Sequence, residues 1–296
     1  MNAVPRRKID VTVTLGTGDF GDGTGNVVTL SGLQVSASII KMGMPGLDQA
    51  TVSVYGATQD FMNRTTRLGV LPNQIRNNGI TISAGDDVSG MAQVFTGTIN
   101  EAYQDFTASP ETCIRFSAMA NGLALLKPVA PLSFPAGADI SVIMSSIAAS
   151  MGLGFQNDGV TGVFLSNQYL PGTAIDQMRA AAKAANINVI PNGGPTGQTL
   201  EIWPMGGART GLSPTFTPQD TLIGYPRVSD LGIAITALYT PNLRFGGRFN
   251  LDQSAIPGAN GSWYCQGVTY DLESETPQGK WFMDIVGSRL AQGAPA

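Results

Sequence analysis

Few residues of this sequence could carry out chemistry, because its 296 residues include no His and only two Cys. Without His, the chain has no Ser-His-Asp or Cys-His nucleophile and no HExxH zinc site. Cys113 and Cys265 lie far apart in the sequence and are too few to bind zinc by themselves. They could pair in an oxidising compartment, but two separate buried thiols are the better interpretation.

A Gly-rich segment, residues 16–21, matches the GxGxxG pattern of dinucleotide-binding loops. Such a loop binds a pyrophosphate only where a helix begins directly after it. Residues 26–30 are strand-like instead, so a hairpin loop is the favoured interpretation. Asp19, Asp22 and Asn26 could offer oxygen atoms to calcium, but an EF-hand needs a Glu at its twelfth position, which this loop lacks.

Three carboxylates near the C-terminus, Asp271, Glu273 and Glu275, are each two residues apart, so on a strand they would share one face. Paired carboxylates can hydrolyse glycosidic bonds, one as the acid and the other as nucleophile or base. Trp263 and Trp281, in the flanking segments, could form a platform for a sugar. The alternative function is therefore a glycan-binding or glycan-cleaving β protein, secreted or part of a virion, although acidic residues on a solvated strand face are the commoner case.

No G-x-S-x-G elbow, P-loop or CxxC motif is present. We therefore predict no catalytic residue, no cofactor and no metal site. Two predicted loops remain as candidate contacts with other domains or proteins. The first is the Gly-rich loop and the second is a hairpin tip, with these residues: Gly18, Asp19, Phe20 and Asp22, and then Asp86 and Asp87.

The composition indicates that other chains bury part of the surface of this protein. Only 13% of the residues are charged, whereas 43% are hydrophobic. With so few charges to keep it dispersed, part of the surface is expected to be buried by partners or by copies of the chain. The net charge of −4 argues against a sequence-specific nucleic-acid partner, which would need a basic face.

The sequence also bears on location. It contains no run of about 18 apolar residues, the length that a membrane-spanning helix needs, so we predict no membrane insertion. Residues 1–8 are polar and basic, and no apolar segment of a secretory signal follows them. The protein is expected to be made, and to fold, in a cytoplasm.

The elements that would position these residues begin with a β region. Apolar and polar residues alternate over residues 9–15 and 33–39, which predicts half-buried strands. Further strands are predicted at 51–55, 80–83, 94–102 and 112–120. Phe61 and Met62 suit a short helix between Thr58 and Leu68. Residues 1–126 are thus predicted to form an antiparallel β domain with one helix.

A Pro-rich linker, residues 127–135, and an α/β insert, residues 136–207, are predicted to follow. Asp139 can cap a helix that ends at Gly152, and Thr173 with Asp176 forms the capping box of a second helix, which Asn186 can end. Residues 187–190 and 200–203 are predicted to pair as a hairpin.

Strands return in residues 208–296, with candidates at 232–239, 243–251, 263–272 and 280–288. The predicted fold class is mainly β (α+β), with two antiparallel β domains and a small α/β insert between them.

Five segments together resemble the baseplate hub proteins of contractile-tailed bacteriophages. They are spread over nearly the whole chain: residues 16–30 with their Phe-Gly-Asp loop, AGDDVSGMAQVFTGT (84–98), SNQYLPGT (166–173), IWPMGG (202–207) and WYCQGVTYDLESETPQGKW (263–281). Related hubs often carry a His near the end of the last of these segments, where this chain has Tyr270.

The resemblance implies a non-enzymatic homotrimer whose subunits each contribute two tail-tube-like β-barrel domains. The ring of six similar domains would adapt the six-fold tail tube to the three-fold central spike and line the path of the DNA. Its implied partners are itself, the tube protein, the spike and other baseplate proteins. It would lie in the virion tail baseplate after assembly in the host bacterial cytoplasm. A tail-tube subunit is a weaker possibility, because one tube domain accounts for less than half of the chain.

Overall fold

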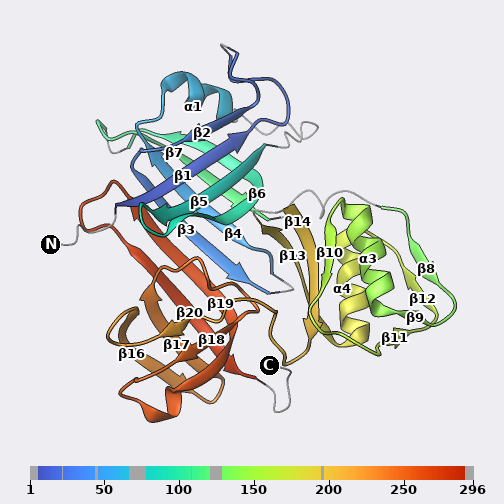
Figure 1. Ribbon diagram of the computed structural model, residues 1–296. Helices are drawn as coiled ribbons and strands as arrows, with labels where there is room; N and C mark the ends of the chain where they lie inside the picture. The colour runs from blue at the N-terminus through green and yellow to red at the C-terminus, as the bar shows by residue number, and fades with distance from the viewer. Residues whose placement is uncertain are drawn as a thin grey trace. The chain divides into compact units, whose positions relative to one another are not determined.

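The structure is a computed structural model that describes residues 6–21, 23–43, 46–66, 78–107, 109–120, 129–194 and 197–290. The chain is mainly β, as predicted, and most of its strands pair in antiparallel fashion (Figure 1). It divides into two compact units. The first holds residues 1–40, 48–122 and 269–283, and the second holds residues 41–47, 123–268 and 284–296.

The first unit is built on an antiparallel sheet, and its first strand shows a regular alternation of buried residues. In β1 (Arg7–Thr14), Ile9, Val11 and Val13 are buried, while the residues between them are half-buried. The strand order is β3, β4, β7, β6, β5, β1, β2. The remaining bounds are β2 Val27–Leu30, β3 Val35–Met42, β4 Gln49–Tyr55, β5 Gly79–Asp86, β6 Gly90–Asp105 and β7 Cys113–Met119.

The predicted short helix is confirmed as α1 (Gln59–Thr65). It begins after Thr58, whose hydroxyl accepts a hydrogen bond from the backbone N–H of Phe61 at 3.3 Å. This satisfies one of the amide donors that a helix leaves free in its first turn. Phe61 and Met62 are buried, so the helix is held by its apolar face.

Both predicted hairpins of this unit are confirmed. The Gly-rich segment connects β1 to β2, which pair antiparallel from Thr14 opposite Val27, so a strand follows this loop rather than a helix. The second hairpin joins β5 to β6, with Asp86 opposite Gly90. A Cβ at Gly85 would collide with the carbonyl oxygen of Gly90, so this close approach of the two backbones requires glycine.

The second unit contains an α/β layer in which two helices pack on a three-stranded sheet (Figure 1). In this sheet β14 pairs with β10 in parallel and with β13 in antiparallel fashion. Its buried core includes Ile143 and Ile147 from the first helix and Met178 from the second. The bounds are α3 Ile140–Met151, β10 Gly154–Asn157, α4 Ala174–Ala185, β13 Ile187–Gly194 and β14 Gly197–Pro204.

The predicted helix ends are confirmed. The Asp139 carboxylate accepts a hydrogen bond from the Ser141 amide at 2.8 Å, and Gly152 ends α3 in the left-handed conformation at φ 72°. Thr173 and Asp176 form both hydrogen bonds of a capping box on α4, and Asn186 ends that helix, also left-handed.

Two short ladders accompany this layer. β8 (Leu132–Phe134) pairs with β12 (Gln168–Leu170), and β9 (Ala138–Asp139) pairs with β11 (Phe164–Leu165). The predicted linker, 127–135, therefore contains a short strand within its described part, while Lys127 and Pro128 lie outside the described residues. The predicted domain boundaries and the closure of the strands into two barrels stay predictions.

The later strands belong to the second unit, except for residues 269–283, the end of β19 and the start of β20, which belong to the first. Their core in the second unit includes an edge-to-face contact between Phe216 and Phe249 at 5.9 Å. The predicted strand 243–251 is too long, because a turn with Gly246 at φ 77° occupies its first half. An unpredicted strand, β16, contains Gly224 and Pro226, which are typical of turns. The bounds are β15 Thr215–Phe216, β16 Leu222–Ser229, β17 Gly232–Leu238, β18 Arg248–Leu251, a 3-10 turn at Pro257–Ala259, β19 Gly261–Ser274 and β20 Trp281–Arg289.

Candidate interaction sites

The Gly-rich loop of the first unit folds back onto α1. The rings of Phe20 and Phe61 stack with their centroids 5.4 Å apart and their planes 9° from parallel. Both rings are buried, at 7% and 5% exposure. Stacked aromatic pairs stabilise beyond the area that they bury, so this pair anchors the loop to the helix.

Polar contacts also hold the Gly-rich loop against α1. The Asp19 carboxylate accepts a hydrogen bond from the Gly21 amide at 3.0 Å, and the Asp19 carbonyl accepts one from Arg64 at 3.2 Å. Arg64 also forms an ion pair with Asp60, four residues earlier on α1. The loop is thus fixed to the helix by one aromatic and one cationic residue.

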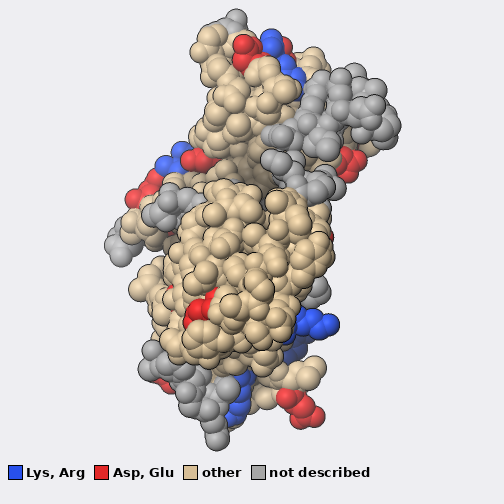
Figure 2. Space-filling view, turned by 90° about the vertical axis from the view of Figure 1, so that its right-hand side faces the viewer, with Lys and Arg blue, Asp and Glu red and all other residues tan. Residues whose placement is uncertain are grey.

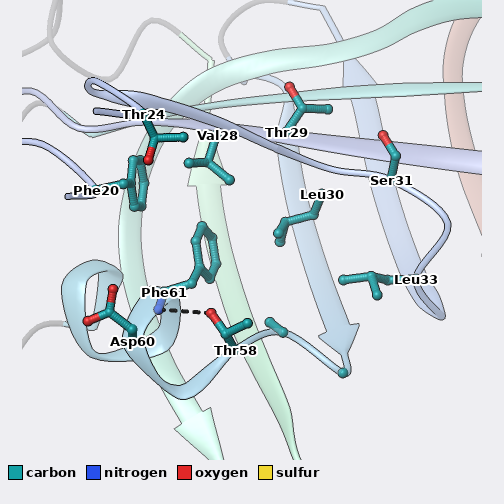
Figure 3. Close-up of a pocket in the computed structure, with 12 residues that line it drawn as sticks. Phe20, Thr24, Val28, Thr29, Leu30, Ser31, Leu33, Thr58, Asp60 and Phe61 are labelled. Carbon is teal, nitrogen blue, oxygen red and sulfur yellow. Dashed lines mark hydrogen bonds between the residues drawn. The ribbon is translucent and has the colours of Figure 1, made fainter. Parts of the chain in front are cut away.

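A shallow cavity of about 360 Å³ opens between this loop, β2 and α1 (Figure 3). Phe20, Phe61 and Leu30 supply apolar parts of its wall, and Leu33 lies at its far end. Its polar groups are hydroxyls and the carboxylate of Asp60. Such a wall suits an apolar side chain from another protein.

The four predicted contact residues of this loop therefore differ in how accessible they are to another protein. Gly18, at φ 81°, has open space around it, and Asp19 is exposed. Phe20 is turned inward onto Phe61, so it supports the loop and presents little of its ring. Asp22 lies outside the described residues.

The second predicted contact is the β5–β6 tip, where the carboxylates of Asp86 and Asp87 both form stabilising interactions. The Asp86 carboxylate accepts hydrogen bonds from the Ser89 and Val88 amides, and these bonds hold the pKa of Asp86 below its ordinary value. Asp87 forms an ion pair with Lys8. Val88, the next residue, is 79% exposed.

The structure does not bring the two predicted loops together. Arg7, at the start of β1, lies opposite Asp86, whereas Thr14, at its end, leads into the Gly-rich loop. An eight-residue strand is about 25 Å long. The two loops therefore lie at opposite ends of β1 and suit two different contacts.

The carboxylates of the alternative function lie partly as predicted. Asp271 and Glu273 alternate with buried residues and share the half-exposed face of β19. The strand ends at Ser274, so Glu275 leaves that face: it adopts φ 55° and forms an ion pair with Arg6.

The two tryptophans are not platforms. Trp263 and Trp281 are 3% and 5% exposed. The guanidinium of Arg289 lies 5.3 Å from the ring centroid of Trp263, and that of Arg7 lies 5.7 Å from Trp281. A sugar would have no tryptophan face on which to stack here.

Sequence reasoning missed a buried charged cluster in the second unit. Glu201 on β14 forms an ion pair with Arg209, and Arg244 lies 3.8 Å from the same carboxylate oxygen. Burial, and next the cation of Arg209, lower the pKa of Arg244. The available signal was a Glu between Leu200 and Ile202 in a strand, where an acid needs a buried partner.

Other functional groups are few. Within the described ranges, no three His, Cys, Asp or Glu residues are grouped in a way that could hold a metal ion. Both cysteines are buried and neither forms a disulfide. Among the described residues, no helix combines the length and apolar character needed to cross a membrane. The face seen in Figure 2 is mostly uncharged.

Comparison with known proteins agrees with this architecture. The family model described as "Baseplate hub gp41" matches residues 8–283. A tail protein from Neisseria meningitidis MC58 has a similar structure, with a TM-score of 0.61 and 10% identity over 95% of this chain and 96% of that one. The 43 kDa tail protein of prophage MuSo2 from Shewanella oneidensis follows, with a TM-score of 0.59, 10% identity and the same coverage.

A third similar structure belongs to a bacterial secretion system rather than to a phage. It is the Escherichia coli protein c3393, described as a component of the type VI secretion system with structural similarity to the T4 tail proteins gp27 and gp5. Its TM-score is 0.56, at 8% identity over 100% of this chain and 78% of that one. No curated protein sequence matches this chain.

Proposed function

Because the chain belongs to the baseplate hub gp41 family, we propose that it is a homotrimeric hub that joins the six-fold tail tube to the three-fold central spike. Membership of this family confirms the predicted resemblance and places the protein among structural proteins of the phage tail. The trimer, the passage of DNA through it, the absence of catalysis and assembly in the host cytoplasm are parts of the proposal.

The observation that carries the proposal is a patch of exposed apolar residues on β16, the outermost strand in its sheet, and on the turn that joins β16 to β17. Tyr225, Val228 and Leu231 are 77%, 51% and 89% exposed. Three large apolar residues exposed within seven positions of one sheet edge are typical of a surface that another chain covers. In a chain with so few charges, this patch is the surface that self-association would cover.

The backbone of β16 favours contact through side chains rather than strand addition. Its register to β17 shifts between Ile223 and Arg227, which marks a bulge, and Pro226 lies inside that bulge. Bulges and prolines are the devices that keep an edge strand from pairing with another chain. A neighbouring subunit would therefore pack on the apolar side chains of the patch.

The two loops of the first unit supply further contacts. The cavity beside α1 and the tip with Asp86 and Asp87 lie at opposite ends of β1, so one can meet the tube while the other meets a neighbouring domain. A net charge of −4 would let the ring repel DNA phosphates, so the genome could slide through it.

The test is the native mass of the purified 30.9 kDa chain over a concentration series, alone and with its candidate spike. A mass of three chains, free or only with the spike, is the expected result. A monomer under both conditions would overturn the ring.

Two matched variants locate the interface. Leu231→Lys is expected to weaken trimer formation, because it places a charge in the patch. Val88→Lys changes a similarly exposed apolar residue, at the β5–β6 tip and outside the patch, and should leave the trimer intact. Equal effects of both variants on the native mass would contradict the assignment of the patch.

A further inference from the structure

The second unit contains a larger cavity, of about 840 Å³, that none of the sites above uses. All of its lining residues belong to this one unit. Part of the wall comes from the C-terminal half of α4 and the start of β13, and part from residues around Trp203, Phe245 and Tyr264. The volume is in the range of sites that bind a small molecule or a peptide side chain.

The floor of this cavity is aromatic and fixed in place. Trp203 and Phe245 meet edge to face with centroids 6.1 Å apart, and Tyr264 packs against them. Arg209, held by Glu201, lies 5.6 Å from the ring centroid of Trp203. Because these rings are already locked, a ligand would lose little free energy in ordering them.

The mouth of the cavity is apolar and adaptable. Met42 and Met205 line it and are 43% and 54% exposed. Methionine side chains are flexible and polarisable, and binding surfaces that accept varied apolar partners are rich in them. Gly43, beside Met42, leaves room for the ring of Phe245, with which a Cβ would collide.

The charged residues that line the cavity are all cations: Arg179, Lys183 and Arg289. No carboxylate is among the described lining residues, although Asp176 interacts with Arg179 from the first turn of α4. In a chain of net charge −4, three cations around an aromatic floor form a local positive site.

We propose that this cavity binds an acidic peptide segment of a partner protein that carries a large apolar side chain. The apolar side chain packs against Met42, Met205 and the half-buried Tyr264, which Trp203 and Phe245 support from below. The flanking carboxylates pair with Lys183 and Arg289 at the rim. Complementary charge selects the partner, while the buried apolar anchor supplies most of the affinity. The inference does not depend on the proposed trimer, because one unit of one chain supplies every lining residue.

The test is a fluorescence-anisotropy titration of the full chain with a labelled peptide, Glu-Asp-Glu-Leu-Phe-Glu-Asp-Glu. Binding that weakens with salt is expected. A peptide with Lys in place of the acids, and one with Gly in place of Leu-Phe, should both fail to bind. Equal binding of the Gly peptide would overturn the proposal, because charge alone would then explain the binding.

Charge-reversal variants place the site. The double variant Lys183→Glu, Arg289→Glu should weaken binding at least about tenfold, because two rim cations become repulsive. The double variant Arg227→Glu, Lys280→Glu reverses two exposed cations outside the cavity, with the same change in net charge, and should leave binding unchanged. If both bind equally well, the cavity is not the site. If the Lys183→Glu, Arg289→Glu variant instead changes the native mass without peptide, a second copy occupies the cavity and the proposal is wrong.

A crosslinking measurement provides a second readout that does not depend on affinity. A benzophenone group in place of the Phe of the peptide inserts readily into methionine C–H bonds. Mass spectrometry should find the crosslinks on Met42 or Met205. Crosslinks confined to other residues would overturn the proposal even if the peptide binds.

Discussion

Arg209 and Glu201 form an ion pair that is almost fully buried, with side chains 1% and 3% exposed and Nε 2.8 Å from Oε2. The same guanidinium donates to the carbonyl of Phe245 at 2.8 Å. Glu201 belongs to β14, and Phe245 to the turn before β18. One arginine therefore ties the α/β layer to the later strands of the second unit, beneath the aromatic floor of the larger cavity.

We predict that Arg209→Met lowers the free energy of unfolding by about 3–5 kcal/mol, since it leaves the Glu201 carboxylate buried without its closest cation. The double variant Arg209→Met, Glu201→Met should recover much of this loss, because it removes the buried carboxylate, while the side chain of Arg244 is 37% exposed and stays in contact with water. Urea unfolding of the full chain measures both. Equal losses in the single and double variants would show that the packing of Arg209 matters rather than its charge.

A second prediction concerns the stacked pair that anchors the Gly-rich loop. Phe61→Ala should cost about 3–5 kcal/mol, as is typical for truncating a buried phenylalanine. Because Phe20 then loses its partner, its amide, which donates to the Gly25 carbonyl at 2.8 Å, should exchange hydrogen faster. Hydrogen exchange read by mass spectrometry measures this.

The control for that prediction is Val88→Ala, at a residue 79% exposed, which should change stability by less than about 0.5 kcal/mol. If Phe61→Ala leaves exchange in residues 16–25 unchanged, the stack does not hold the loop.

Local signals in the sequence were sufficient for the elements but not for the sites. Asp139 and Gly152 mark the ends of α3 because capping depends on neighbours within one turn. The inward position of Phe20 depends on Phe61, a residue distant in sequence, so the sequence predicted Phe20 as a contact residue but not its stacking on α1. β16 was missed because its Gly and Pro form a bulge that only the pairing with β17 reveals.

The capping box of α4 predicts a pH dependence. Hydrogen bonds from the hydroxyl and the backbone of Thr173 hold the pKa of Asp176 below its ordinary value. The folded state therefore gains stability above the unfolded pKa, about 3.9, and loses it as the pH falls through the lower folded pKa. Asp176→Asn should be less stable than the native chain near pH 6, with the difference shrinking below pH 4. Thermal melting across this pH range measures the difference in stability between the two proteins. A difference that grows at low pH would contradict a stabilising role of the Asp176 carboxylate in the capping box.

Both thiols should be unreactive in the folded chain. Cys113 is 3% exposed, and burial raises the pKa of Cys265 to about 12. At pH 8 almost no Cys265 thiolate is therefore present, and the thiolate is the reactive form. A thiol reagent should label neither residue until guanidinium unfolds the chain, and should then label both. Rapid labelling of the folded chain would show that one site opens, and Cys113→Ser would identify which.

The last prediction tests the alternative function, using Asp271 and Glu273. Both lie on the half-exposed face of β19, but Glu273 already accepts a hydrogen bond from the Lys280 amide at 3.0 Å, at the turn into β20. The Glu273 carboxylate therefore stabilises the turn between β19 and β20. Since Trp263 and Trp281 are buried, no tryptophan face near them is open to a sugar.

Asp271→Asn and Glu273→Gln are therefore expected to leave trimer formation unchanged, and the native chain is expected to show no binding to an array of bacterial polysaccharides and no release of reducing sugar. Glu273→Gln keeps the shape of the side chain and removes only its charge, so a loss of activity could not be attributed to misfolding. If the native chain cleaves a polysaccharide and either variant abolishes the cleavage while keeping its melting temperature, the hub also acts on glycans. Asp10→Asn, a change at a half-buried acid on β1, is the matched control and should retain that activity.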